Sequence, residues 1–399
     1  MSILILNSIP HYRNPYEKHL KELGEELIVL TAEKHKEGFE VGDFAYVESF
    51  ENYDHSGSIE KRALELYDQY QYHTILADYE FDIYRAAELR ELLNLKGGQT
   101  VSSSQVYRNK VLMKERVQRH GIKVPTFQEI KSPLDLILFV KEHGYPIVIK
   151  PIDGAGSMET LVIHNETELN SFLSDGIPHH IMAESFIKGD LYHVDGFVYN
   201  GEIIFLCASK YLQFPIEYSN TSYTGGYVLP PNQTLAKRLT EETRKVVEAL
   251  ETPLHTSIHA EWFHTEDDQI IFCEIASRAG GGRIKETVEY TFGFNVYEAA
   301  NRAKCNLPIQ LPPEKEIDTI YGRILMMSKE GTFLSPPDSP SPVPVVLEEI
   351  IGKKGKHYDG PYNCTDAIAA FVVDGKTENE VVDKLMAISK WFENGARWE

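Results

Sequence analysis

Two glutamates on either side of a short acidic turn are the residues of this chain best suited to chemistry. Glu261 and Glu274 belong to two apolar, β-prone stretches that flank the dipeptide Asp267-Asp268. This pattern predicts an antiparallel hairpin. If Asp267 and Asp268 form its tip and the ladder has no bulge, Glu261 lies directly opposite Glu274.

A pair of opposed glutamates requires a cation. Directly opposed residues share one face of a sheet, with Cβ atoms roughly 5 Å apart, and like charges there are destabilising. Two carboxylates suit Mg²⁺, a hard cation that takes oxygen ligands and binds substrate phosphates beside one or two protein carboxylates. The alternative is a solvated hairpin face on which the two acids have no role.

The composition limits the partners of the chain. Its 399 residues include 40 basic and 60 acidic side chains, for a formal net charge of -20. This balance argues against nucleic acid and against an anionic membrane surface, because both recruit clustered Lys and Arg. The length predicts two or three domains. Four widely separated cysteines fit neither a zinc site nor a disulfide framework.

The first residues give no sign of export. Met-Ser-Ile-Leu-Ile-Leu-Asn has no basic region, and its apolar run is too short for a signal peptide. No later apolar stretch reaches the length of a membrane span. We therefore expect a cytoplasmic location.

The first hundred residues alternate between strand and helix patterns. Short buried strands are predicted at 3–7, 26–31 and 74–77, and charged helical patterns at 15–24, 57–71 and 82–95. Such alternation favours a parallel sheet with helices on its faces, that is, a Rossmann-like unit. The unit contains no G-x-G-x-x-G, so a dinucleotide role has little support. A further helix is predicted at about 105–120.

After residue 145 the pattern becomes that of an antiparallel sheet, so the fold class is α/β followed by α+β. A strand ending at Lys150-Pro151 leads into a glycine-rich loop at 153–158 and a further strand. Strands are then predicted at 192–199 and 202–208, around an Asn200-Gly201 turn. The other expected elements are a strand at 160–164, helices at 166–174, 233–250, 284–303 and 377–393, a proline-rich loop at 335–344 and a strand at 367–373.

Four pieces occur in a characteristic order. They are Lys150 on a strand, the glycine-rich loop 153–158, the acidic linker 184–190, and the paired glutamates followed by Arg278. In this order and spacing the chain resembles the ATP-grasp superfamily of carboxylate–amine and carboxylate–thiol ligases, over nearly its whole length. The resemblance implies a Rossmann-like domain (1–104), a small ATP-grasp lobe (105–184), a large lobe with the metal site (185–306) and a small C-terminal subdomain packed on the large lobe (307–399).

The resemblance also implies which residues hold ATP. A lysine at the end of an apolar strand is costly to desolvate without an anionic partner, which favours a phosphate role for Lys150. Backbone N–H groups of a glycine-rich loop can fold over phosphates, although a plain turn has the same composition. The implied nucleotide-binding residues are Lys110 and Lys150 on phosphates, Gly154, Gly156 and Ser157 over the β- and γ-phosphates, Glu184 and Ile187 at adenine, and Asp190 at the ribose, with His193 as a competitor.

The same resemblance assigns the chemistry. Glu261 and Glu274 match metal ligands for Mg²⁺, with Mn²⁺ as an alternative. Arg278, four positions beyond the second acid, would stabilise an acyl phosphate or a tetrahedral oxyanion, and Lys210 would reach the γ-phosphate or acyl phosphate. Many relatives carry an asparagine two residues after the second acid, where this chain has Ala276. The resulting Glu-x-Ala-x-Arg form, followed by Gly280-Gly-Gly282, more closely resembles the bacterial L-amino-acid ligases and their relatives. It puts the metal affinity or the number of magnesium ions in doubt.

The expected activity is an ADP-forming ligase that activates a carboxylate, of an amino acid by preference, and transfers it to an amine. Two alternatives remain open. One is a ligase that loads an amino acid onto an acyl-carrier protein in antibiotic biosynthesis; the other is a nucleotide-binding regulatory module without turnover. The sequence does not define the carboxylate, the acceptor or the oligomeric state.

Overall fold

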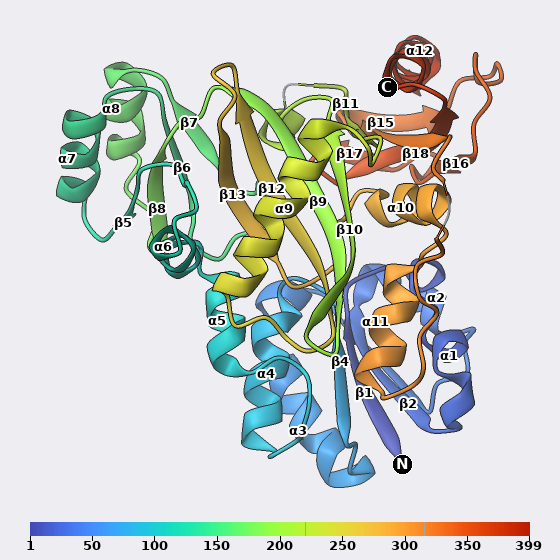
Figure 1. The fold of residues 1–399 in the computed structure, drawn as a ribbon. Coiled ribbons are helices and arrows are strands. Elements are labelled where there is room, and N and C mark those ends of the chain that lie inside the picture. Colours follow the sequence, from blue (N-terminus) through green and yellow to red (C-terminus); the bar gives the residue numbers. More distant parts are fainter. Residues whose placement is uncertain (220, 315) are drawn as a thin grey trace.

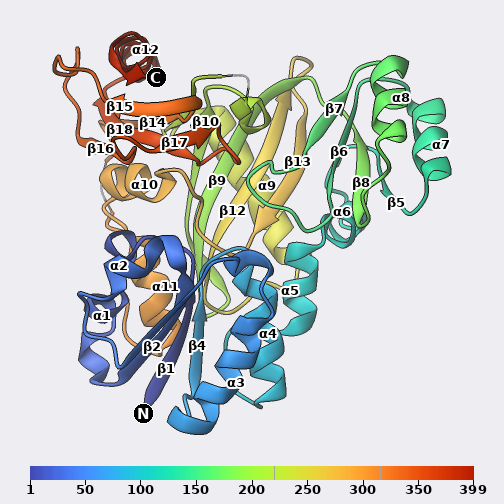
Figure 2. The same ribbon diagram turned by 180° about the vertical axis from the view of Figure 1, so that it is seen from behind.

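The computed structural model describes residues 1–219, 221–314 and 316–399 (Figure 1). The N-terminal domain lies beneath a long antiparallel sheet; a small lobe lies beside one edge of this sheet, and the C-terminal strands extend its other edge (Figures 1 and 2). Within the described residues, no helix is both long and apolar enough to cross a membrane.

The N-terminal domain is the parallel unit expected from the alternating pattern. Its sheet has the order β3-β2-β1-β4, and its strands pair in parallel. The central strands are buried on both faces, which explains their nearly continuous apolar sequence. The strands are β1 (Ser2–Asn7), β2 (Glu26–Ala32), β3 (Tyr46–Phe50) and β4 (Thr74–Ala77); the helices are α1 (Tyr16–His19), α2 (Lys36–Phe39), α3 (Ser58–Tyr70) and α4 (Asp82–Leu92).

The small lobe contains a four-stranded antiparallel sheet of order β5-β8-β6-β7. Strands β6 and β7 pair as a hairpin around residues 152–160, so the glycine-rich loop connects two paired strands as predicted. The elements of this lobe are α5 (Val101–Arg108), α6 (Lys110–Arg119), β5 (Phe127–Ile130), α7 (Pro133–His143), β6 (Ile147–Pro151), β7 (Leu161–Ile163), α8 (Glu166–Ser174) and β8 (Ile181–Ser185).

The large lobe is built on an eight-stranded sheet of order β13-β12-β9-β10-β11-β14-β18-β16. Three strands of the C-terminal part continue this sheet, so that part extends the large lobe as well as packing on it. The large-lobe elements before residue 306 are β9 (Gly189–Tyr199), β10 (Glu202–Tyr211), β11 (Tyr223–Val228), α9 (Thr234–Ala249), β12 (Thr256–Thr265), β13 (Ile270–Ala276), α10 (Ile284–Phe292) and α11 (Val296–Lys304).

The C-terminal part closes the chain with a helix on the sheet. Residues 336–346 form neither helix nor strand, in agreement with the loop predicted at 335–344. Its elements are β14 (Ile320–Met327), β15 (Glu330–Ser335), β16 (Leu347–Ile350), β17 (His357–Asp359), β18 (Ala367–Gly375), α12 (Glu378–Gly395) and β19 (Arg397–Trp398).

Two predicted helices are broken in the structure. The helix expected at 105–120 is two helices, because Asn109 leaves the helical conformation and its side-chain oxygen accepts the N–H groups of Val111 and Leu112 at 3.0 Å. The helix expected at 284–303 is likewise interrupted, at Gly293, whose φ of 71° ends α10. The predicted domain limit at 104/105 falls inside α5, and the limit at 184/185 falls inside β8.

Candidate active site

The two glutamates of the hairpin are directly opposed, as predicted, but not in the way predicted. Glu261 of β12 pairs with Glu274 of β13. The turn is a three-residue loop, 266–268, with Asp268 at a φ of 60°, and not a two-residue tip. The ladder also contains a bulge, because Trp262 pairs with Phe272 and leaves Cys273 as an extra residue. The two departures cancel, so the expected pair survives.

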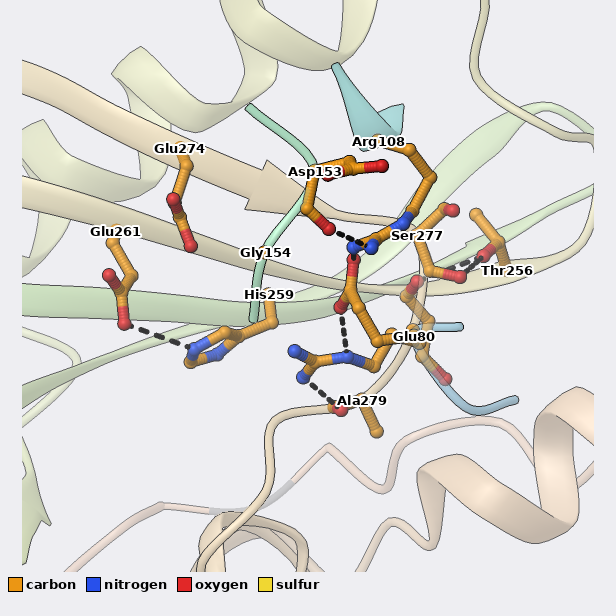
Figure 3. A network of polar contacts seen from close by, with 12 residues as sticks. Glu80, Arg108, Asp153, Gly154, Thr256, His259, Glu261, Glu274, Ser277 and Ala279 are labelled. Carbon is orange, nitrogen blue, oxygen red and sulfur yellow. Dashed lines mark hydrogen bonds and ion pairs between the residues drawn. The ribbon is translucent and has the colours of Figure 1, made fainter. Parts of the chain in front are cut away.

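Each glutamate of the pair has a different set of neighbours. The Tyr211 hydroxyl donates a hydrogen bond of 2.8 Å to Glu261, and His259 Nε2 lies 3.6 Å from the same carboxylate (Figure 3). Burial raises the pKa of Glu261, but His259 and Tyr211 outweigh this effect and hold it below its usual value. Glu274 lies 3.7 Å from the Lys110 ammonium. The pKa of Glu261 is therefore held low, and Glu274 lies close to a cation.

The donor set suits Mg²⁺. Two carboxylate ligands on adjacent strands, close to the glycine-rich loop, match the preference of this cation for oxygen ligands. Ala276, which stands where many ATP-grasp enzymes carry an asparagine, pairs with His259 across the hairpin. Paired residues share a face, so an imidazole stands next to the methyl group at this position. The protein ligands offered from the hairpin itself are thus the two glutamates.

A buried cluster of three side chains, His193, Asp195 and His259, adjoins Glu261 through His259. Asp195 accepts from His259 Nδ1 at 2.9 Å and contacts His193 Nδ1 at 2.5 Å, while Arg323 lies 3.3 Å from His193 Nε2. The three side chains bring possible ligand atoms within 4.8 Å of one another, but direct hydrogen bonds already join them, and Arg323 adds a positive charge. We read the cluster as hydrogen-bonded support for the sheet. The predicted contact of His193 with ribose remains a prediction, and its full burial gives that contact no support.

The glycine-rich loop is held by the start of α6. Because α6 begins at residue 110, the Lys110 backbone N–H donates to Ile152 O at 3.0 Å and its ammonium donates to Gly154 O at 2.7 Å. Gly156 and Ser157 have φ values of 62° and 59°, a left-handed turn that glycine adopts readily. The loop also contacts the C-terminal part of the chain, where the Cys364 N–H donates to Gly156 O at 3.3 Å.

Lys150 is buried against a carboxylate that a second lysine shares. Its ammonium lies 2.7 Å from Glu184, and Lys114 lies 3.2 Å from the other oxygen of Glu184. Lys114 also donates to Cys273 O at 2.6 Å. Burial raises the pKa of Glu184, but Lys114 and Lys150 outweigh this effect and lower it to about 2. One carboxylate thus faces two cations, which leaves a positive charge for an anionic ligand.

The linker between the lobes lies where the resemblance placed it. Residues 186–188, which include Ile187, join β8 of the small sheet to β9 of the large sheet. Since Glu184 is committed to two lysines, its expected contact with adenine remains a prediction. Asp190 and Lys210 pair with each other at 2.7 Å, so their expected contacts with ribose and phosphate also remain predictions.

Arg278 is oriented by a residue from the N-terminal domain. Its Nε donates to Glu80 at 2.6 Å and its Nη1 donates to Ala279 O at 2.8 Å. The second oxygen of Glu80 binds Arg108, and Arg108 also donates to the Asp153 carbonyl at the start of the glycine-rich loop (Figure 3).

Sequence reasoning missed three of these residues. Lys114 lies four positions after Lys110 on one helix, a spacing that places both on the same helix face. Glu80 closely follows β4, and ligand-binding residues of open parallel sheets gather at the carboxyl ends of strands. Those two signals were available in the sequence, whereas Arg108 carries none beyond its position next to Asn109.

Comparisons with known proteins find relatives among ATP-grasp proteins. A family model described as "ATP-grasp domain" matches residues 107–282. An L-arginine-specific L-amino acid ligase of Bacillus subtilis is 25% identical over 305 residues, 71% of this chain and 71% of that protein. A D-alanine–D-alanine ligase of Clostridium beijerinckii is 26% identical over 197 residues, 48% of this chain and 58% of that protein.

A solved structure supports the fold along the whole chain. The L-amino acid ligase from Bacillus licheniformis superimposes with a TM-score of 0.80, over 100% of this chain and 98% of that one, at 15% sequence identity. At this identity the likeness concerns the fold alone. It confirms the expected order of a Rossmann-like domain followed by the two-lobed fold.

Proposed function

We propose that this chain uses ATP to join an amino-acid carboxylate to an amine. It is an ATP-grasp domain protein of the carboxylate–amine ligase type, similar to bacterial L-amino acid ligases. Proteins of this family use ATP with Mg²⁺. In the proposed reaction the carboxylate attacks the γ-phosphorus of ATP, which gives an acyl phosphate and ADP. The amine then attacks the acyl carbon, and phosphate leaves.

One observation carries the proposal. The Lys110 ammonium donates to the Gly154 carbonyl of the glycine-rich loop and lies 3.7 Å from Glu274 of the glutamate pair. The Lys110 side chain thus contacts the glycine-rich loop proposed to bind the phosphates and also lies close to one of the proposed metal ligands. This is the arrangement that phosphoryl transfer needs, because the catalysis rests on positioning and neutralising phosphate oxygens.

The proposed roles of the site residues are of two kinds, binding and charge stabilisation. Lys110, Lys150 and the backbone of loop 153–158 hold the phosphates of ATP. Glu261 and Glu274 hold Mg²⁺, which neutralises phosphate charge when bound. Arg278 offers its guanidinium to the acyl phosphate and to the oxyanion that forms when the amine attacks. The hydrogen bond from Cys364 to Gly156 joins this loop to the C-terminal part.

The test measures phosphate released from ATP and Mg²⁺ in the presence of pooled L-amino acids, followed by mass spectrometry of the products. We expect release that requires amino acids and yields dipeptides. Glu274→Gln should reduce the rate by roughly 100-fold or more, as expected for lost stabilisation of transition-state charge. Glu266→Gln is the matched control, because Glu266 lies in the same hairpin and is exposed.

Two other outcomes separate the alternatives. Release that requires a phosphopantetheinylated carrier protein, with no dipeptide formed, would replace the amine by a thiol acceptor and favour the antibiotic-pathway alternative. Tight binding of ATP without release in any amino-acid pool would contradict the ligase and favour a regulatory nucleotide-binding module. The cytoplasmic location remains a prediction beside these.

A further inference from the structure

Glu80 joins the N-terminal domain to two parts of the candidate active site at once. It follows β4 and is buried, with 8% of its side chain exposed. One oxygen accepts from Arg278 Nε at 2.6 Å, and the other binds Arg108 (Figure 3). Burial raises the pKa of Glu80, but Arg278 and Arg108 outweigh this effect and lower it to about 2, so the carboxylate is ionised at neutral pH.

The second arginine carries the connection to the glycine-rich loop. Arg108 is the last residue of α5, and its guanidinium donates to the Asp153 carbonyl as well as to Glu80. The next contact along the loop is made by Lys110, which holds Gly154 O at 2.7 Å. A continuous set of charge-assisted bonds therefore runs from the loop through Arg108 and Glu80 to Arg278.

These bonds also fix the direction of Arg278. Its Nε donates to Glu80 and its Nη1 donates to Ala279 O, so two of its three nitrogens are engaged. Among the described residues, Nη2 has no hydrogen-bond acceptor, and it is not among the buried polar atoms without a partner. The planar fork is thus held by two nitrogens while the third faces a solvent-accessible space.

We propose that Glu80 is a positioning residue that aims Arg278 at the reacting group and couples this arginine to the glycine-rich loop through Arg108. The inference rests on the proposed ligase function. It gives the N-terminal domain a part in the reaction, because that domain supplies the carboxylate on which both arginines depend. A purely structural role would stabilise the domain interface without affecting Arg278 in particular.

The experiment is a double-mutant cycle on the full chain. Glu80→Gln should lower kcat roughly 10- to 100-fold, since a misplacement of about 1 Å can cost about 100-fold. In an Arg278→Ala background the same change should cost less than about 3-fold, because Glu80 acts through that arginine. Equal losses in both backgrounds would overturn the proposal. Glu80→Asp, which keeps the charge, should recover part of kcat.

Two further variants keep the test interpretable. Asp82→Asn is the control, because Asp82 is a buried carboxylate of the same domain that pairs with Arg85 at 2.7 Å, in a separate ion pair; we expect wild-type kcat. Arg108→Gln breaks the set of bonds on the loop side and should raise KM for ATP several-fold with a smaller effect on kcat. An unchanged KM for ATP in Arg108→Gln would refute the coupling even if Glu80→Gln does not fold.

A failure of the ligase function is distinguishable from a failure of this inference. If the wild-type protein releases no phosphate with any acceptor, the proposed function fails. The coupling is then read from hydrogen exchange of residues 153–158 with Mg²⁺ and a non-hydrolysable ATP analogue. Protection that is lost in Glu80→Gln and kept in Asp82→Asn supports the coupling, and protection that persists in Glu80→Gln overturns it.

Discussion

Replacement of Lys150 by methionine tests whether the buried lysines of the small lobe serve ATP or only the fold. In the structure Glu184 lies 2.7 Å from Lys150 and 3.2 Å from Lys114. Burial lowers the pKa of Lys150, but Glu184 outweighs this effect and raises it above its usual value. Lys150 is therefore charged across the physiological range.

The structure sets the size of two separate effects. Lys150→Met removes one charge-assisted bond to phosphate, worth about 1.5–3 kcal/mol, which corresponds to an ATP Kd raised roughly 10- to 100-fold. Glu184 keeps Lys114, so the buried carboxylate is not left unpaired, and the loss of stability should stay below that of the double variant. Lys114→Met combined with Lys150→Met leaves a buried carboxylate unpaired and should cost about 3–5 kcal/mol.

The assay combines calorimetric binding of a non-hydrolysable ATP analogue with urea unfolding. Lys131→Met is the control, because Lys131 is an exposed lysine of the same lobe that pairs with Glu129 at 3.1 Å. The control should bind and unfold like the wild type. An unchanged Kd in Lys150→Met would contradict a phosphate role for Lys150. A single variant as unstable as the double variant would contradict the shared pairing of Glu184.

Two further predictions concern stability. A Cβ at Gly189, where the chain enters the large sheet, would lie 2.4 Å from His264 O, so Gly189→Ala should lower the free energy of unfolding by about 1–3 kcal/mol; an unaltered urea midpoint would contradict this. Burial raises the pKa of Glu286, but Arg13 and Arg283 outweigh this effect and lower the pKa from 4.5 to about 2. The ionised carboxylate therefore stabilises the fold fully above about pH 4.5, and this stabilisation is lost as the pH falls toward 2. The loss should amount to about 3 kcal/mol, and unfolding curves of Glu286→Gln should lack it; the same acid dependence in variant and wild type would contradict the assignment.

The sequence predicts most of the regular elements because their signals are local. Strands β1, β2 and β4 lie within a residue or two of the predicted ranges, and α8 (Glu166–Ser174) matches its range. Breaks in helices were missed, because an asparagine inside a helical pattern is a weak signal until its cap bonds are seen. That break matters for function, since it makes Lys110 the first residue of α6 and brings it to the glycine-rich loop.

The opposed glutamates show how a correct pair can follow from an incorrect ladder. The loop of the hairpin has one residue more than predicted, Glu266, which was expected to end the first strand. The bulge at Cys273 adds one residue to the second strand, β13, and restores the pairing. Loop length and bulges depend on twist and packing across the sheet, which the alternating pattern does not contain.

The contacts that join domains were beyond sequence reasoning. Glu80 and Arg278 are 198 positions apart and meet only after the N-terminal domain has packed against the two lobes. No periodicity links such residues. The shared use of Glu184 by Lys114 and Lys150 is similar, because it depends on how α6 lies across the small sheet.

In the proposed reaction, the glutamate pair, the glycine-rich loop and Arg278 activate a carboxylate as an acyl phosphate. The most direct measurement supplies amino acids labelled with ¹⁸O in the carboxylate, together with ATP and Mg²⁺, and determines the mass of the phosphate released. We expect each released phosphate to carry one ¹⁸O, because the carboxylate oxygen that attacks the γ-phosphorus leaves with the phosphate when the amine displaces it. Amino-acid-dependent release of unlabelled phosphate would contradict it.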